Sequence, residues 1–141
     1  MERRLIRQYG VIPYRRSANG AIEVMLVTSR ETRRWVIPRG NPISGLTGAQ
    51  SAAREAFEEA GVEGSLADAI GTYAYDKRKA SGIVPAEVTV YPMAVSSVLD
   101  DWPERHERER RWFAPGDAAA AVDEAGLGVL VIKVKQLLLA P

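Results

Sequence analysis

Residues 40–62 read GNPISGLTGAQSAAREAFEEAGV, a glycine-rich loop followed directly by a helix-forming segment. Thr47 can accept a hydrogen bond as the N-cap of this helix, and Gln50 three residues later completes a capping box. The alanines are strong helix formers, and Gly61 is suited to a left-handed C-cap. The stretch therefore predicts a loop over residues 39–46 and a helix that ends at Gly61.

The acidic residues of this segment recur at helical spacing. Residues at i, i+3 and i+4 lie on one helix face, so Glu55, Glu58 and Glu59 are expected to point roughly the same way. Carboxylates that close repel one another unless a cation lies among them, and Mg²⁺ and Mn²⁺ prefer oxygen ligands. Glycine lets the main chain come close, so a carbonyl of the loop can complete the ligand shell. The alternative is an ordinary exposed helix with an Arg54–Glu58 ion pair.

The flanking segments alternate between β-rich runs and helix-forming runs. Residues 10–14 and 23–27, separated by the turn-like Ser17–Gly20, predict a hairpin. Further strands are predicted over 35–38, 69–76, 87–99 and 110–113, and helices over 117–125 and 127–139. Interleaved strands and helices around one mixed sheet predict an α+β fold. The length of 141 residues predicts a single domain over residues 1–141.

Composition excludes several classes of protein. The chain has no cysteine, so disulfides and zinc–thiolate sites are excluded. No apolar run reaches the roughly 18 residues that a membrane-spanning helix needs. The N-terminus lacks the features of a secretory signal, and the expected compartment is the cytoplasm. A nucleic-acid partner is not expected, because the basic residues are spread among acids and the pI is about 8.0.

The net charge of +1 conceals an uneven distribution of charge along the chain. Residues 1–40 contain nine Lys or Arg and three Asp or Glu, whereas residues 41–76 contain one Arg and six Asp or Glu. An acidic segment beside basic ones indicates a cation site next to an anion site. The alternative is that these charges form solvated surfaces.

The stretch from Gly40 to Val62 resembles the Nudix box, which reads G, five residues, E, seven residues, then REUXEEXGU, with U a bulky aliphatic residue. The matching positions are Gly40, Arg54, Glu55, Glu58, Glu59, Gly61 and Val62. Leu46 stands in place of the first Glu of the box, and Ala56 in place of the bulky aliphatic residue. The resemblance implies an α/β/α sandwich, with a mixed β-sheet between helices, that hydrolyses a diphosphate linked to another group.

The resemblance also implies a role for each matching residue. The Gly40 carbonyl, Glu55 and Glu59 would bind Mg²⁺ or Mn²⁺. Glu58 would be a candidate general base, and Arg54 would be the second catalytic residue. The family's first Glu usually pairs with the Arg matching Arg54 and braces the loop. Its replacement by Leu46 therefore bears on the rigidity of the loop more than on metal binding.

Matches beyond the box are similar to the diphosphoinositol polyphosphate phosphohydrolase branch, which also cleaves dinucleoside polyphosphates. They are Trp35–Pro38, Lys77–Lys79, Asp101–Trp102 and Arg110–Phe113. A polyphosphate substrate needs several cationic side chains near the metal. The predicted set is Arg7, Arg15, Arg30, Arg33, Arg39, Lys77, Arg78, Lys79 and Arg110. The run Lys77–Lys79 is expected to leave a strand and enter a loop, where it forms either a ligand contact or a solvated turn.

Two other functions stay open at this point. A housecleaning hydrolase of nucleoside triphosphates or nucleotide sugars would need a base-stacking pocket, and no segment predicts one. A non-catalytic Nudix-like module that senses a phosphorylated ligand is favoured by Leu46 and disfavoured by the intact carboxylates. The expected partner is a small-molecule polyphosphate, and the expected state is a monomer or a homodimer.

Overall fold

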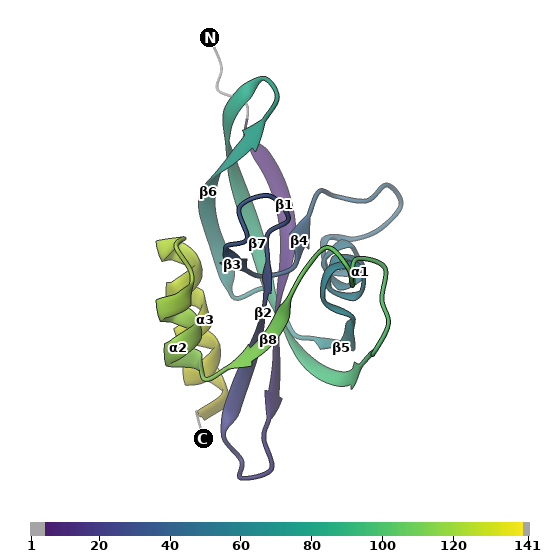
Figure 1. Cartoon of the computed structure of the whole chain (residues 1–141). Coiled ribbons are helices and arrows are strands. Elements are labelled where there is room, and N and C mark those ends of the chain that lie inside the picture. The colour runs from purple at the N-terminus through teal and green to yellow at the C-terminus, as the bar shows by residue number, and fades with distance from the viewer. Residues whose placement is uncertain (1–4, 140–141) are drawn as a thin grey trace.

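The computed structural model describes residues 5–139 and contains an eight-stranded mixed sheet with three helices packed on its two faces (Figure 1). The strands are β1 (Ile6–Arg16), β2 (Ile22–Thr28), β3 (Trp35–Val36), β4 (Arg39–Gly40), β5 (Val62–Leu66), β6 (Gly71–Lys79), β7 (Gly82–Val98) and β8 (Arg110–Phe113). The helices are α1 (Gly48–Ala60), α2 (Pro115–Ala121) and α3 (Ala125–Leu139). Within the described residues, no helix has both the length and the apolar composition needed to cross a membrane.

The sheet has the strand order β3-β2-β1-β7-β5, and its central pair, β1 and β7, is parallel. The predicted hairpin is confirmed, with Tyr14 paired to Val24 across β1 and β2. Strand β6 pairs with β7, β8 pairs with β2, and β4 pairs with β1. The pairing of Tyr9 with Gly40 places the start of the glycine loop against the centre of the sheet.

The two faces of the sheet carry separate apolar cores. Val11 faces α1, where it packs in one cluster with Ala52 and Ala56, and all three are fully buried. The next residue, Ile12, faces the opposite side and packs in a second cluster with Leu127 of α3. Successive side chains of a strand point to opposite faces, so β1 contributes to both cores. The predicted α+β sandwich, with helices on both sides of a mixed sheet, is confirmed.

Helix α1 begins and ends at the predicted caps. The Thr47 hydroxyl accepts a hydrogen bond from the Gln50 amide at 3.1 Å, and Gln50 Oε1 accepts one from the Thr47 amide at 2.9 Å. Gly61 has a φ of 65°, and its amide donates to the Phe57 carbonyl at 3.0 Å. The predicted capping box and left-handed C-cap are both confirmed.

Strands β4 and β5 were not predicted, and three helix boundaries differ from the prediction. Strand β4 lies inside the predicted loop over 39–46, and helix α2 ends at Ala121 instead of residue 125. Position 64 of β5 requires glycine, because a Cβ there would come within 2.1 Å of the Ala94 carbonyl oxygen. This close approach between strands depends on tertiary pairing and leaves no local pattern in the sequence. Helix α2 begins at Pro115, two residues before the predicted start, because proline fits the first helical position. Helix α3 begins at Ala125 instead of residue 127.

The prediction that Lys77–Lys79 enters a loop is wrong. Strand β6 continues to Lys79, which pairs with Gly82 at the start of β7. Pro85 weakened the signal for an early start of β7. Proline is tolerated there because the pairing of β7 with β1 begins only at Ala86. The two strands therefore form a hairpin that extends beyond the rest of the sheet (Figure 1).

Candidate functional site

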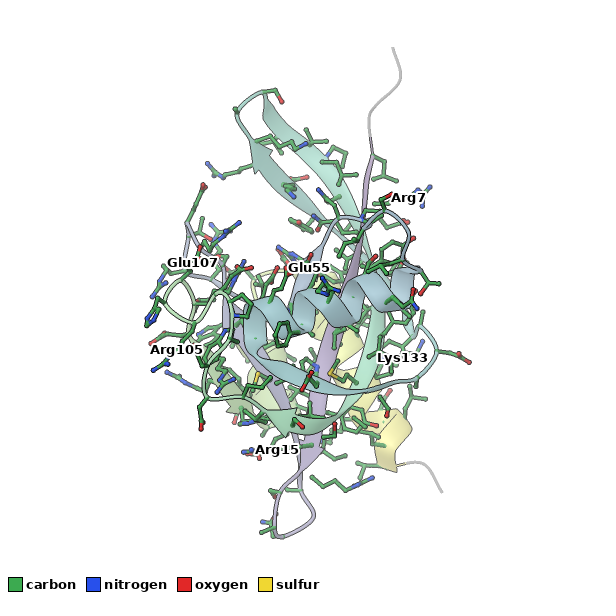
Figure 2. The ribbon with its side chains drawn as sticks, turned by 90° about the vertical axis from the view of Figure 1, so that its right-hand side faces the viewer. Arg7, Arg15, Glu55, Arg105, Glu107 and Lys133 are labelled. Carbon is green, nitrogen blue, oxygen red and sulfur yellow. The ribbon has the colours of Figure 1, made fainter. Side chains whose placement is uncertain are left out.

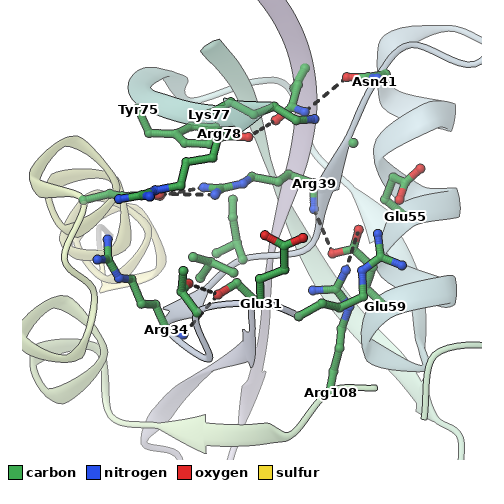
Figure 3. A pocket seen from close by; sticks show the side chains of 18 of the residues that line it. Glu31, Arg34, Arg39, Asn41, Glu55, Glu59, Tyr75, Lys77, Arg78 and Arg108 are labelled. Atoms are coloured by element: carbon green, nitrogen blue, oxygen red, sulfur yellow. Dashed lines mark hydrogen bonds and ion pairs between the residues drawn. The ribbon is translucent and has the colours of Figure 1, made fainter. Parts of the chain in front are cut away.

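A cleft of about 480 Å³ opens where α1, the glycine loop and the β6–β7 hairpin meet (Figure 3). Its other wall comes from the loop after β2 and from the connection between β7 and β8. The cleft brings together seven of the predicted site residues: Arg30, Arg39, Gly40, Glu55, Glu59, Lys77 and Arg78. The cleft is therefore the candidate functional site.

The acids of α1 divide into two groups. Glu55 and Glu59 line the cleft, but Glu58 does not. The adjacent residues Glu58 and Glu59 point about 100° apart around the helix, and the cleft meets the face that carries Glu55 and Glu59. The expectation that all three carboxylates point the same way is thus not met. No group of three His, Cys, Asp or Glu side chains within residues 5–139 is arranged to hold a metal ion.

Glu59 is the most deeply buried acid of the site, with a side chain that is 8% exposed. Its Oε1 accepts a hydrogen bond from the Arg39 amide at 3.4 Å, and its Oε2 lies 3.7 Å from the nearest guanidinium nitrogen of Arg108 (Figure 3). Burial raises the pKa of Glu59 to about 8, and the positive charge of Arg108 only partly opposes this shift. Burial also raises the pKa of Glu55.

The donors around Gly40 fit a divalent cation. A Cβ at Gly40 would lie 2.6 Å from Glu55 Oε1, so the main chain there lies directly against this carboxylate, and a larger residue would displace it. After burial, the nearby Glu55 also raises the pKa of Glu59, because two ionised carboxylates repel. A divalent cation would offset this repulsion. Two carboxylates and a main-chain carbonyl are oxygen donors of the kind that Mg²⁺ and Mn²⁺ bind.

The glycine loop is braced from α1, although not by the residues that the Nudix box uses. Arg54 is exposed and makes no ion pair with a described residue, and Leu46 is partly buried. The buried Ser51 hydroxyl accepts a hydrogen bond from the Ile43 amide at 3.0 Å. The Leu46 amide also donates to the Ile43 carbonyl at 3.0 Å. Ser51 thus supplies a link between loop and helix that the missing Glu cannot make.

We expect Ser51→Ala to lower the free energy of unfolding by about 1 kcal/mol, because it leaves a loop amide without its acceptor. Urea denaturation measures this loss. Ser65→Ala, at an exposed position of β5, is the matched control and should be nearly neutral. Equal stability of the two variants would show that Ser51 does not brace the loop.

Arg110 holds the end of α1 and is not brought to the cleft. Its guanidinium donates to the Ala60 carbonyl at 2.9 Å and the Leu99 carbonyl at 2.6 Å, and it stacks on Trp102 at 3.8 Å. Trp102 Nε1 donates to the Glu59 carbonyl at 3.1 Å. These donors satisfy carbonyls that the end of a helix leaves unpaired. Arg110 therefore helps to position the helix turn that carries Glu59.

Four more of the predicted cations are not among the residues that line the cleft. Arg7 pairs with Glu87 at 3.2 Å. Arg15 pairs with Glu23 at 2.9 Å, at the end of β1 that lies far from Glu55 (Figure 2). The remaining two are Arg33, which donates to the Glu107 carbonyl at 3.1 Å, and Lys79, which ends β6.

Arg39 lines the cleft, but its guanidinium is already well bonded. It donates to both carboxylate oxygens of Glu124, at 2.5 and 3.2 Å, and to the Tyr73 hydroxyl at 2.7 Å. It also stacks on the Tyr75 ring, with Cζ 3.6 Å from the ring centroid. The side chain is only 13% exposed. Arg39 therefore connects the segment before α3 to the strand that leads into Gly40.

Sequence reasoning missed several residues of the cleft. Gln8 is buried, accepts a hydrogen bond from the Tyr75 hydroxyl at 2.7 Å and donates to Asn41 Oδ1 at 3.1 Å. A polar residue on the apolar face of β1 was the available signal for Gln8. The others include Arg108, Glu104 and Glu124, whose surrounding sequence has no periodicity that could have indicated them.

The comparisons with known proteins identify the family. The family model described as "NUDIX domain" matches residues 6–131, so the chain belongs to the Nudix family. This confirms the resemblance that was based on residues 40–62. The fold and the acidic helix beside a glycine loop are thus those of a Nudix domain.

Named relatives and a solved structure agree with this assignment. The chain is 30% identical over 112 residues to Nudix hydrolase 21, chloroplastic, of Arabidopsis thaliana, covering 77% of this chain and 56% of that protein. It is 35% identical over 99 residues to diphosphoinositol polyphosphate phosphohydrolase 2 of Rattus norvegicus, covering 68% and 52%. The chain thus spans about half the length of these two curated relatives. The structure of the C. elegans Ap4A hydrolase is similar to this one, with a TM-score of 0.68 and 22% sequence identity. The match covers 96% of this chain and 99% of that chain, and it supports the fold alone.

Proposed function

We propose that the chain is a divalent-metal-dependent pyrophosphohydrolase that cleaves a phosphoanhydride bond of a polyphosphorylated small molecule. One observation carries this proposal: Glu55 and buried Glu59 meet beside the main chain of Gly40 in a cleft that also contains cations. Burial of two acids side by side destabilises the fold unless a cation compensates, so the arrangement favours a function that uses one.

The mechanism assigns a task to each element of the site. Glu55, Glu59 and the Gly40 carbonyl would hold Mg²⁺ or Mn²⁺. When bound, this ion polarises a phosphoryl oxygen and lowers the pKa of bound water. Glu58 is the proposed general base that takes the proton of the attacking water. Phosphoryl transfer needs little covalent help, so positioning and charge stabilisation by the cleft supply most of the acceleration.

The free cations of the cleft support a substrate with several phosphates. No ion pair joins Lys77 or Arg78 to an acid within the described residues, and both line the cleft. Burial, followed by the nearby charges of Lys79 and Arg39, lowers the pKa of Lys77, which indicates a place where a bound anion would be stabilising. We propose diphosphoinositol polyphosphates or diadenosine polyphosphates as substrates. The similarity to diphosphoinositol polyphosphate phosphohydrolase 2 supports the first of these.

A substrate panel with chromatographic detection of the products tests the proposal. We expect turnover of polyphosphorylated substrates with Mg²⁺ or Mn²⁺ and no turnover with EDTA, because the metal supplies the Lewis acid. A clear preference for nucleotide sugars or nucleoside triphosphates would favour the housecleaning hydrolase instead. Tight binding of polyphosphates without turnover would favour the non-catalytic sensing module.

A further inference from the structure

Arg108 occupies a fixed position in the cleft, although it lies in the connection between β7 and β8. Its Nε donates to Glu104 Oε1 at 2.9 Å, and its Nη1 donates to the Thr28 carbonyl at 3.0 Å. The side chain is only 8% exposed. Glu104 is itself anchored, because its amide donates to the Glu58 carbonyl of α1 at 3.0 Å. The guanidinium is therefore held from two sides before any ligand binds.

The third nitrogen of this guanidinium has no hydrogen bond. Nη2 lies 3.7 Å from Glu59 Oε2, which is an ion-pair distance but longer than a hydrogen bond. Within residues 5–139, every side-chain nitrogen or oxygen that is fully buried has a hydrogen-bond partner. Nη2 has none, so it is not fully buried, and Arg108 is one of the residues that line the cleft. Arg108 thus presents unpaired N–H donors beside the proposed metal ligand.

We propose that Nη2 of Arg108 donates to the phosphoryl group under attack. This inference rests on the proposed function, because it places the scissile phosphate beside Glu59. An anion there lies close to two carboxylates and needs a cation at the same point. A planar guanidinium that is already held in position suits phosphate oxygens and requires little rearrangement as charge develops.

The other arginines of the cleft are less suited to this task. Arg78 is exposed, and no hydrogen bond or ion pair with a described residue fixes its position. Arg30 and Arg34 have side chains that are about 60% exposed, and they pair with Glu107 and Asp123. Arg39 is bonded to both oxygens of its acid. The competing explanation is that Arg108 only neutralises Glu59. In that case its loss would act through the metal and not through the phosphate.

The experiment compares Arg108→Gln and Arg108→Lys with Arg105→Gln, an exposed position of the same loop. Calorimetry measures the affinity for Mn²⁺ alone and for imidodiphosphate, a non-hydrolysable diphosphate, at saturating Mn²⁺. Turnover of diadenosine tetraphosphate is measured in parallel. We expect Arg108→Gln to bind imidodiphosphate about tenfold more weakly and to lose at least about tenfold in kcat, because a charge-assisted hydrogen bond is removed. Its Mn²⁺ affinity should not fall, because the variant removes a positive charge that would repel Mn²⁺ beside Glu59.

The outcomes separate this inference from the proposed function. If wild type binds neither Mn²⁺ nor imidodiphosphate, the proposed function fails. If wild type binds both, and Arg108→Gln matches Arg105→Gln in analogue affinity and kcat, the role of Arg108 is overturned. The role of Arg108 is also overturned if weaker Mn²⁺ binding by Arg108→Gln accounts for all of its loss in analogue affinity and kcat. Should Arg108→Gln not fold, Arg108→Lys decides: the lysine lacks the planar fork, so full wild-type affinity and kcat would overturn the role.

Discussion

Glu59→Gln is expected to reduce metal-dependent turnover by at least about a thousandfold, because it removes a charged metal ligand from the proposed metal site. Glutamine keeps the size of the side chain, so the packing of α1 against the sheet is preserved. The carboxylate is buried and its pKa is raised to about 8, so its charged form does not favour folding. We therefore expect the variant to fold at least as well as wild type and to lose Mn²⁺ binding in calorimetry.

The matched control for this variant is Glu63→Gln, the same chemical change at an exposed position of β5. Turnover and Mn²⁺ affinity of the control should equal those of wild type. Turnover by Glu59→Gln within about tenfold of the control would contradict the assignment of Glu59 as a metal ligand. Loss of activity with unchanged Mn²⁺ affinity would contradict it as well, because the effect would then lie in another step.

The parts of the fold that were predictable are those fixed by local chemistry. Thr47 and Gln50 start α1, and Gly61 ends it, because caps depend on residues within one turn of the helix end. The hairpin of β1 and β2 was predictable for the same reason. Strand β5 depends on its pairing with β7, and a bulge follows Glu63 in that pairing. Such long-range pairing has no counterpart in the spacing of residues.

The candidate site shows the same division between local and distant information. Gly40, Glu55 and Glu59 belong to one contiguous segment, and the sequence indicated all three as lining one site. Arg108 and Glu124 reach the cleft only because loops from distant parts of the chain converge there. Five of the nine predicted cations do not line the cleft, because a surface arginine and a ligand-binding arginine look alike in sequence.

Glu58→Gln is expected to lower kcat by at least about a hundredfold while Mn²⁺ affinity stays close to that of wild type. The amide cannot take a proton from water, and it removes no ligand of the proposed metal site. The Glu58 side chain is partly buried and does not line the cleft. A change of side-chain rotamer on substrate binding is therefore part of this prediction. Single-turnover kinetics on diadenosine tetraphosphate, at saturating Mn²⁺, measures the chemical step directly.

The comparison of Glu58→Gln with Glu58→Asp tests whether this carboxylate acts as the base. Aspartate keeps the proton acceptor but shortens its reach, so it should restore part of the rate. A purely structural role would lower the stability of both variants and would leave their kcat values, per folded molecule, alike. If Glu58→Gln kept wild-type kcat, the base would have to be a group that already lines the cleft. Glu31 and Asp76, which line it from opposite walls, would then be the residues to replace next.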